Sequence, residues 1–345
     1  MREIKGDLCH EQLVETMKQE LAFDENRDYG EWKATVKEKL TELLGVREIE
    51  KNACSLHLEI EEETQKDGYK QIRFTFESEK NCFVPCYILI PDTGKEKYPV
   101  VITLQGHYNG GMYGSIGEIR TEADKNYQPR GAFAVQAVKQ GYIALAIEQR
   151  AMGERKTRHH PFDPFGCTHS TMMAFELGRT TIGERVWDVQ RAIDTLSQFP
   201  QADTDKIVIT GNSGGGTASY YAACLEERIK IAVPSCSFCS YKTSILRMHH
   251  CPCNYIPNAY KWFEMQDVAC MIAPRNLAIV AGKEDGIFPM KGVQTSFETV
   301  QKIYAKENAT ENCRVVETPK GHWWCEDIIW PTVQEEMIKL GWKEK

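Results

Sequence analysis

The chain has 345 residues, of which 42 are basic and 49 acidic, so its formal charge is -7. This balance argues against a nucleic-acid or anionic-membrane partner and favours a small-molecule substrate. The first residues, MREIKGDLCHEQ, include no apolar export segment, and no run reaches the length of a membrane helix, so we expect a cytoplasmic protein.

Helical spacing dominates the first 50 residues. In EWKATVKEKLTELLG, apolar residues recur at Trp32, Val36, Leu40 and Leu43, and Gly45 supplies a C-terminal stop. We therefore expect an N-terminal helical extension over residues 1–50. The length alone permits one large domain or two ordinary ones, but without repeats or linkers we favour a single domain over residues 51–345.

Alternating apolar residues follow, first at Leu56, Leu58 and Ile60 and then in IRFTF (72–76), which predicts antiparallel strands with one solvent-exposed face. From Tyr98 the pattern changes to continuous apolar runs, YPVVITLQ, GYIALAIE, KIVITG, IKIAVPS and RNLAIVAG. Helix-like segments separate most of these runs, including an amphipathic one over residues 181–199. Strands that are apolar on both faces indicate an α/β fold with a mostly parallel, doubly wound sheet. Irregular stretches near 156–180 and 236–265 are interpreted as cap-like insertions.

The stretch IVITGNSGGGTAS (207–219) places a serine and three consecutive glycines directly after a strand. Glycines weaken a helix by about 1 kcal/mol each, so a steric reason is expected for them. The pattern from Gly211 to Gly215 fits G-x-S-x-G, a strained turn that exposes a nucleophilic serine, here Ser213. A phosphate-binding loop is the alternative, but the lysine and hydroxyl of that motif are missing.

A serine nucleophile needs a base and an orienting carboxylate. Asp285 follows the strand NLAIVAG, and His322 follows the strand CRVVET, so the order along the chain is Ser213, Asp285, His322. Glu284 competes with Asp285 for the carboxylate role, and we favour Asp285. The backbone N–H groups of Gly214 and His107 are the expected oxyanion-hole donors, because His107 lies in the glycine-containing loop LQGHYNGG. A catalytic role for its imidazole is the less favoured reading.

Seven segments carry a specific resemblance: LQGHYNGG, EQRAMGER, LGRTTIGERVWDVQRAIDTL, GNSGGG, HHCPCNYIPN, IAPRNLAIVAGKEDGIFP and GHWW. Over residues 80–325 the chain resembles the acetyl xylan esterase and dienelactone hydrolase-like branch of the α/β-hydrolases. It departs from the common R-G-x-G turn of that branch, because Ala151 replaces the first glycine after Arg150.

The resemblance implies hydrolysis of acetyl or other short acyl esters of a carbohydrate or small molecule, with no cofactor and no metal. It also implies that Arg150 and an Arg185/Asp188 pair are scaffold charges. Tyr108, Met152 and Trp323 are the expected walls of a short acyl pocket. Aromatic rings that could contact a sugar are Tyr108, Phe162, Phe165, Tyr255 and Trp323.

Other readings stay open at this point. Cys236, Cys239, His249, His250, Cys251 and Cys253 have ligand types that suit zinc, although their spacing is not that of a standard finger. Most of the 13 cysteines are expected to be reduced and buried, with redox sensing as an alternative. A serine peptidase of the prolyl-oligopeptidase type would use the same triad, and a non-catalytic binder could share the fold. The acyl group, the alcohol and whether the chain forms a homo-oligomer are not determined.

Overall fold

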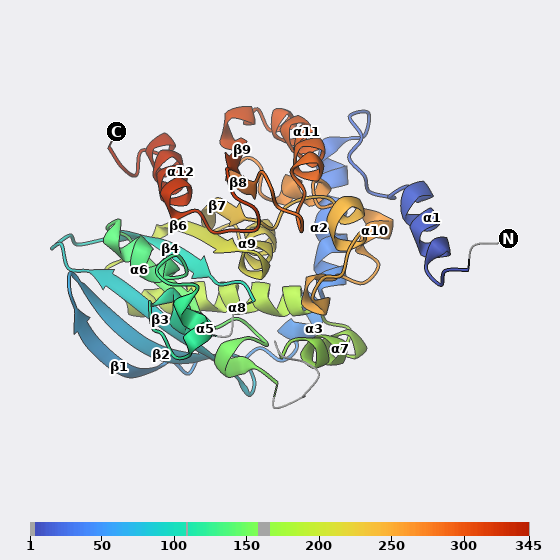
Figure 1. Cartoon of the computed structure of the whole chain (residues 1–345). Coiled ribbons are helices and arrows are strands. Elements are labelled where there is room, and N and C mark those ends of the chain that lie inside the picture. Colours follow the sequence, from blue (N-terminus) through green and yellow to red (C-terminus); the bar gives the residue numbers. More distant parts are fainter. Residues whose placement is uncertain (1–3, 108–109, 158–165, 345) are drawn as a thin grey trace.

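The computed structural model describes residues 4–107, 110–157 and 166–344. Its centre is a nine-stranded sheet in the order β1-β2-β3-β5-β4-β6-β7-β8-β9, with helices on both faces (Figure 1). The predicted α/β fold with a mostly parallel sheet is confirmed. The strands are β1 (Glu59–Lys66), β2 (Tyr69–Glu79), β3 (Cys82–Pro91), β4 (Tyr98–Leu104), β5 (Ile143–Ile147), β6 (Ala202–Asn212), β7 (Ile229–Ser235), β8 (Asn276–Gly282) and β9 (Cys313–Thr318).

The pairing of the strands follows the two sequence patterns. β1 pairs with β2, β2 with β3 and β3 with β5 in antiparallel register, whereas β5, β4, β6, β7, β8 and β9 are parallel neighbours. The continuous apolar runs form the parallel strands, because both of their faces are covered. The carboxyl ends of these strands therefore lie at one edge of the sheet, where α/β enzymes gather their functional groups.

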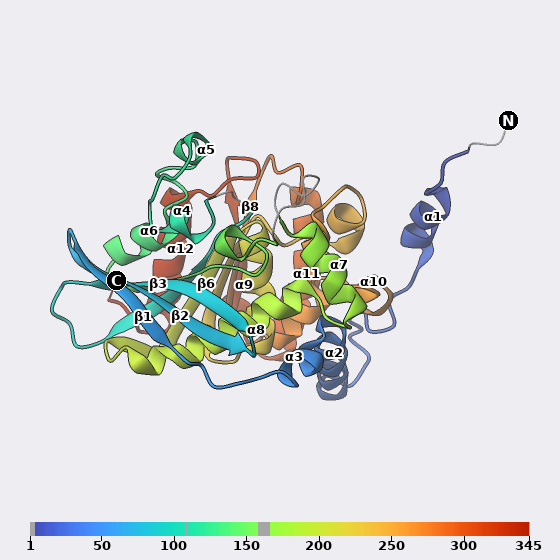
Figure 2. The same cartoon turned by 90° about the horizontal axis from the view of Figure 1, so that it is seen from below.

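The helices divide the core into two layers. One layer includes α2, α8, α9 and α11, and the other includes α4, α6 and α12. Figure 2 shows the sheet and these helices from a perpendicular direction. The α-helices are α1 (Leu8–Thr16), α2 (Tyr29–Leu44), α3 (Val46–Glu50), α4 (Met112–Ser115), α5 (Glu122–Lys125), α6 (Phe133–Lys139), α7 (Thr168–Glu176), α8 (Thr181–Thr195), α9 (Gly214–Leu225), α10 (Ala259–Trp262), α11 (Met290–Lys306) and α12 (Glu326–Lys339). None of the described helices is both long enough and apolar enough to cross a membrane.

The N-terminal helices pack unevenly. α2 ends as predicted at Gly45, which has a positive φ of 73°, and its residues Trp32, Val36 and Leu40 join the main core. α1 buries none of its residues and projects from the body in both views (Figures 1 and 2). The helical extension is thus partly a structural element of the core.

One strand differs from the prediction. β1 begins only at Glu59, so Leu56 and Leu58 precede it and pack against the core as partly buried residues. Ile60 is 48% exposed. β1 pairs with β2 alone at the sheet edge, and nearly all of its side chains are exposed, which explains why the predicted buried face is missing. The segment 72–76 of β2 has the expected alternation.

The two irregular stretches meet each other. In the first, α7 follows Cys167, and in the second a short 3₁₀ turn, η4 (Pro252–Asn254), follows a π-helical turn, η3 (Tyr241–Ile245). α7 contacts η4, and both contact α8. Cys167, Cys251, Cys253 and Ala151 form a small separate cluster at this junction.

Candidate active site

The serine turn lies between β6 and α9. Ser213 has φ 56° and ψ -123°, a conformation that side-chain-bearing residues rarely adopt. Two backbone hydrogen bonds hold it there: the Ser213 N–H donates to the Ser235 carbonyl at 2.9 Å, and the Thr217 N–H donates to the Ser213 carbonyl at 2.8 Å. This geometry is typical of a nucleophile turn.

Close backbone approach explains the glycines. A Cβ at Gly211 would lie 2.5 Å from the Leu104 carbonyl oxygen, and one at Gly215 would overlap the same oxygen. A Cβ at Gly216 would lie 2.5 Å from the Ser235 carbonyl oxygen. The glycines therefore allow α9 to start directly against β4 and β7.

Asp285 and His322 are brought together from the loops after β8 and β9. His322 Nδ1 lies 2.9 Å from Asp285 Oδ2, while the N–H groups of Ile287 and Phe288 donate to Asp285 Oδ1 at 2.8 and 3.0 Å. Burial acts to raise the pKa of Asp285, but His322 and these two donors outweigh it and hold that pKa below its ordinary value. An ionised Asp285 favours the imidazole tautomer with its proton on Nδ1, which leaves Nε2 as an acceptor. The side chain of Glu284 is exposed.

Cys236 is a neighbour of this pair that sequence reasoning did not place here. Its Sγ lies within 4.8 Å of ligand atoms of Asp285 and His322. Burial, with a contribution from the Asp285 charge, raises the pKa of the Cys236 thiol to about 12. The thiol is therefore protonated near neutral pH and does not compete with Asp285 as an anionic partner of His322.

Ser213 and His322 line the same cavity, which has a volume of about 100 Å³. The described residues that line it come mainly from the loop after β4, the segment before α6, the serine turn and the loop after β9: Gln105, Gly106, His107, Tyr127, Arg130, Gly131, Phe133, Asn212, Ser213, His322 and Trp324. The rings of Phe133 and Trp324 stack with centroids 4.1 Å apart. The cavity is small, partly aromatic and opens onto the predicted nucleophile.

The predicted pocket residues have mixed positions. Met152 is buried, and its Cε lies 3.5 Å from the point where a Gly214 Cβ would be. Trp323 is not among the residues that line the cavity: it is 42% exposed, and its ring stacks on the Arg130 guanidinium at 3.4 Å in a neighbouring hollow. Trp324, the next residue, takes the place expected for Trp323. Tyr108 lies outside the described residues.

Of the other predicted sugar contacts, only Tyr255 is among the described residues, and it does not line the cavity. Tyr255 is partly buried against the main core, and Phe162 and Phe165 lie outside the described residues. Tyr127, Phe133 and Trp324 are the aromatic rings found instead.

The loop after β4 touches the serine turn. A Cβ at Gly106 would lie 2.8 Å from the Asn212 carbonyl oxygen and 3.1 Å from Ser213 Cβ, so the peptide leading into His107 passes beside the nucleophile. Beneath this loop, Gln105 Nε2 donates to Glu148 at 2.8 Å, and the Gln149 side chain donates to the Gln105 carbonyl. Burial raises the pKa of Glu148 to about 7.

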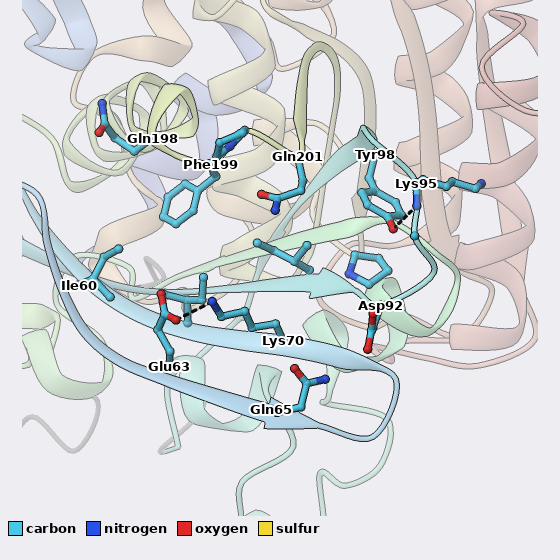
Figure 3. A pocket seen from close by; sticks show the side chains of 15 residues that line it. Ile60, Glu63, Gln65, Lys70, Asp92, Lys95, Tyr98, Gln198, Phe199 and Gln201 are labelled. Carbon is cyan, nitrogen blue, oxygen red and sulfur yellow. Dashed lines mark hydrogen bonds and ion pairs between the residues drawn. The ribbon is translucent and has the colours of Figure 1, made fainter.

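A larger cavity of about 470 Å³ lies at the opposite edge of the sheet (Figure 3). Tyr98 at the start of β4 and Gln201 just before β6 line it, so it is at the amino ends of the parallel strands. A Lys70–Glu63 ion pair spans part of its wall. Its 15 described lining residues include no serine, cysteine or histidine, so none of them could form a serine–histidine or cysteine–histidine pair.

The scaffold charges pair differently from the expectation. Asp188 binds Arg150 at 2.8 Å and Arg155 at 2.7 Å, not Arg185. Arg185 instead donates to the Arg150 carbonyl and, at 3.5 Å, to Cys253 Sγ. Arg185 and Asp188 are only three residues apart on α8, but the Arg185 side chain extends to the Arg150 carbonyl and the cysteine junction, while Arg150 and Arg155 occupy Asp188.

The cysteine and histidine set that suggested zinc is also divided. Cys236 lies beside His322, Cys239 contacts Thr243 and His250 contacts Ser244, whereas Cys251 and Cys253 are at the junction with α7. The described cysteines form no disulfide bond.

A mostly parallel sheet with a strained serine turn after a central strand defines the α/β-hydrolase class. The chain belongs to the Abhydrolase family, whose model matches residues 4–321. The resemblance seen in the sequence is thereby confirmed at the level of family and fold, and the match includes the N-terminal helices.

Individual proteins are similar to this chain in sequence or in fold. A Bacillus subtilis (strain 168) protein named "Putative hydrolase YtaP" is 27% identical over 243 residues, which cover 69% of this chain and 77% of the relative. A 4-O-methyl-glucuronoyl methylesterase of Phanerochaete carnosa (strain HHB-10118-sp) is 32% identical over 106 residues, covering 28% of this chain and 24% of that protein. A Bacteroides fragilis NCTC 9343 structure described as a "putative acetyl xylan esterase" superposes with a TM-score of 0.78 at 18% identity, covering 97% of this chain and 95% of that one.

Proposed function

We propose that the protein is a serine esterase that hydrolyses short acyl esters, acetyl above all, of a carbohydrate or another small molecule. One observation carries the proposal: His322, which is paired with Asp285, and Ser213 of the strained turn line the same cavity at the carboxyl edge of the sheet. The names of the esterases that share the fold or part of the sequence support a carbohydrate ester as the substrate class.

In the proposed mechanism His322 Nε2 takes the Ser213 proton as Oγ attacks the ester carbonyl carbon. The negative charge that develops on the carbonyl oxygen is stabilised by the N–H groups of Gly214 and His107. The tetrahedral intermediate collapses to an acyl-enzyme, and the imidazolium returns its proton to the departing alcohol. Water then attacks the acyl-enzyme by the same route, releasing the acid and restoring Ser213.

The small cavity supports a short acyl group. A space of about 100 Å³, with Trp324 and Phe133 packed on one side, leaves little room for additional methylenes. In a closed apolar slot each misfitting methylene costs about 1–3 kcal/mol of transition-state binding. Arg130 supplies a polar group at the same cavity for the alcohol part.

A series of nitrophenyl esters of increasing acyl length tests the proposal. We expect kcat/KM for the acetate to exceed that for the butyrate by at least about tenfold, and the octanoate to be nearly inert. Ser213→Ala measured in parallel gives the background. Equal turnover of octanoate and acetate, or faster turnover of a matched amide, would contradict the short-acyl esterase assignment and favour a lipase-like or peptidase activity.

A further inference from the structure

A second group of reactive side chains lies directly behind the serine turn. The ligand atoms of His107, Cys167, Cys251 and Cys253 all lie within 4.8 Å of one another. His107 Nε2 is 3.4 Å from Cys167 Sγ and 3.2 Å from Cys253 Sγ, and the Sγ atoms of Cys167 and Cys251 are 2.7 Å apart. Cys167 and Cys253 have no exposed surface.

We propose that these four side chains bind one zinc ion as a closed Cys₃His site. Zinc prefers tetrahedral sites built from thiolate sulfur and imidazole nitrogen, with bonds of about 2.3 Å to sulfur and about 2.0–2.1 Å to nitrogen. Such bonds place the ligand atoms about 3.5–3.8 Å from one another. The two His107 contacts are within a few tenths of an ångström of that spacing, and the Sγ atoms of Cys167 and Cys251 would reach it by moving about 1 Å apart.

A buried arginine supplies the positive charge that an anionic zinc–thiolate site requires. Three thiolates and one zinc ion carry a net charge of -1, once each ligating thiol has released its proton to solvent. Arg185 is 2% exposed, and its guanidinium donates to Cys253 Sγ at 3.5 Å. Within the described ranges no carboxylate lies at ion-pair distance from Arg185, so an anionic thiolate cluster provides the countercharge that a buried guanidinium needs.

The four ligands come from three segments that the ion would join. Cys167 precedes α7 in the first insertion, Cys251 and Cys253 flank the start of η4 in the second, and His107 belongs to the loop after β4. α7 and η4 both lie against α8, and α7 is visible beside α8 in Figure 1. Four protein ligands leave no position for water or substrate, so the ion would be structural and not catalytic.

The site adjoins the proposed oxyanion hole. A Cβ at Gly214 would lie 3.1 Å from His107 Nδ1 and 3.2 Å from its Cε1, so the imidazole packs against the first residue of α9. An ion on Nε2 would fix this ring and with it the His107 peptide. This consequence for the loop rests on the proposed function, whereas the presence of the ion does not.

Metal analysis of the full chain, purified without an affinity tag or chelators, tests the site directly. We expect one zinc per chain in the wild type and a near-complete loss in Cys253→Ser. Cys239→Ser is the matched control, because Cys239 is equally buried but lies outside the cluster, and it should retain the ion. Circular dichroism of both variants reports whether they fold.

Cobalt binding to the metal-depleted wild type tests the site without depending on the folding of a variant. Tetrahedral cobalt with thiolate ligands gives a sulfur-to-metal charge-transfer band and intense visible bands, which we expect at one cobalt per chain and not in Cys253→Ser. A zinc-free protein whose added cobalt gives no such bands would overturn the proposal. So would a thiol titration that shows a Cys167–Cys251 disulfide in the purified protein. Neither result would bear on ester hydrolysis, so failure of the metal site and failure of the esterase assignment are distinguishable.

Discussion

The two sides of the serine turn are built differently. On one side, Ser213, Asp285 and His322 each follow a strand of the parallel sheet, and the sheet sets their positions. On the other side, the Cys₃His cluster joins two insertions and a loop, and no regular element holds its four side chains in register. Side chains that follow the strands of a sheet are already close together, and hydrogen bonds complete their alignment. Side chains that lie in separate loops need a cross-link to hold them together, and the proposed ion would supply it.

Removing the nucleophile should have the largest effect. We expect Ser213→Ala or His322→Ala to lower kcat by about 10⁶-fold, as losing a triad member does in serine hydrolases. The unfolding temperature should change little, because the Ser213 turn is held by backbone hydrogen bonds that alanine also forms. Nitrophenyl acetate hydrolysis and thermal unfolding measure the two outcomes. Retention of activity in Ser213→Ala would contradict the assignment of Ser213 as the nucleophile.

Replacing the Asp285 carboxylate should have the second largest effect. Asp285→Asn keeps the shape of the site but destabilises the tautomer of His322 that acts as a base, and we expect a loss of about 10⁴-fold in kcat. Glu284→Gln is the matched control, since its side chain is exposed one residue away. The kcat of both variants, from steady-state kinetics, shows which of the two carboxylates orients His322. A large loss in Glu284→Gln with little change in Asp285→Asn would exchange their roles.

A change next to the Cys₃His cluster should have a smaller effect than a change in the triad. Arg185→Gln removes the positive charge beside Cys253 and should weaken metal affinity by about 10–100-fold, the usual effect of losing an outer partner of a ligand. Competition with a coloured zinc chelator measures this affinity. Arg191→Gln, on the same helix but paired with Asp194, should bind the metal like the wild type. Equal affinities in the two variants would mean that Arg185 does not balance the cluster.

The smallest predicted effect concerns the buried carboxyl beneath the oxyanion loop. The pKa of Glu148 is raised from 4.5 to about 7 by burial, although the Met112 and Glu154 N–H groups and Arg155 act in the opposite direction. The folded state therefore binds more protons than the unfolded state between these values, so the stability from this group is full below pH 4.5 and is lost as the pH rises through about 7.

We expect the unfolding temperature of the wild type to fall by a few degrees across this window, and less so in Glu148→Gln. Glu63→Gln, on the exposed β1, is the control that should keep the wild-type slope. Calorimetry at several pH values measures the unfolding temperature of each protein. Parallel slopes for the wild type and Glu148→Gln would show that Glu148 does not titrate with folding.

The strands that position the triad residues could be predicted, because their hydrophobic pattern is visible in the sequence. Continuous apolar runs marked β4, β6 and β8, and the strand-like segment CRVVET marked β9. Functional residues of such folds follow the strand ends, so the sequence could nominate Ser213, Asp285 and His322, and the structure places each of them after a strand. The edge strand β1 was misplaced, because a strand that is exposed on both faces has no alternation to read.

The loop side could not be predicted in the same way. Cys251 and Cys253 stood out, but the sequence grouped them with Cys236 and Cys239, which are their neighbours along the chain and not in space. His107 is 146 residues from Cys253, and Cys167 is 84 residues from Cys251, although the side chains of each pair are in contact. For the same reason the sequence favoured Trp323 over Trp324 as a pocket wall, since in an irregular loop nothing in the pattern tells which of two adjacent rings turns inward.

The claim on which the account depends most is that Ser213 is the nucleophile. Mass spectrometry of the full chain after treatment with a serine-directed fluorophosphonate tests it most directly, with peptide mapping to locate the adduct and residual esterase activity measured on the same sample. We predict one adduct per chain, on Ser213, with activity lost in proportion to labelling. An adduct on another serine that abolishes activity, or full activity in a chain labelled at Ser213, would contradict the account.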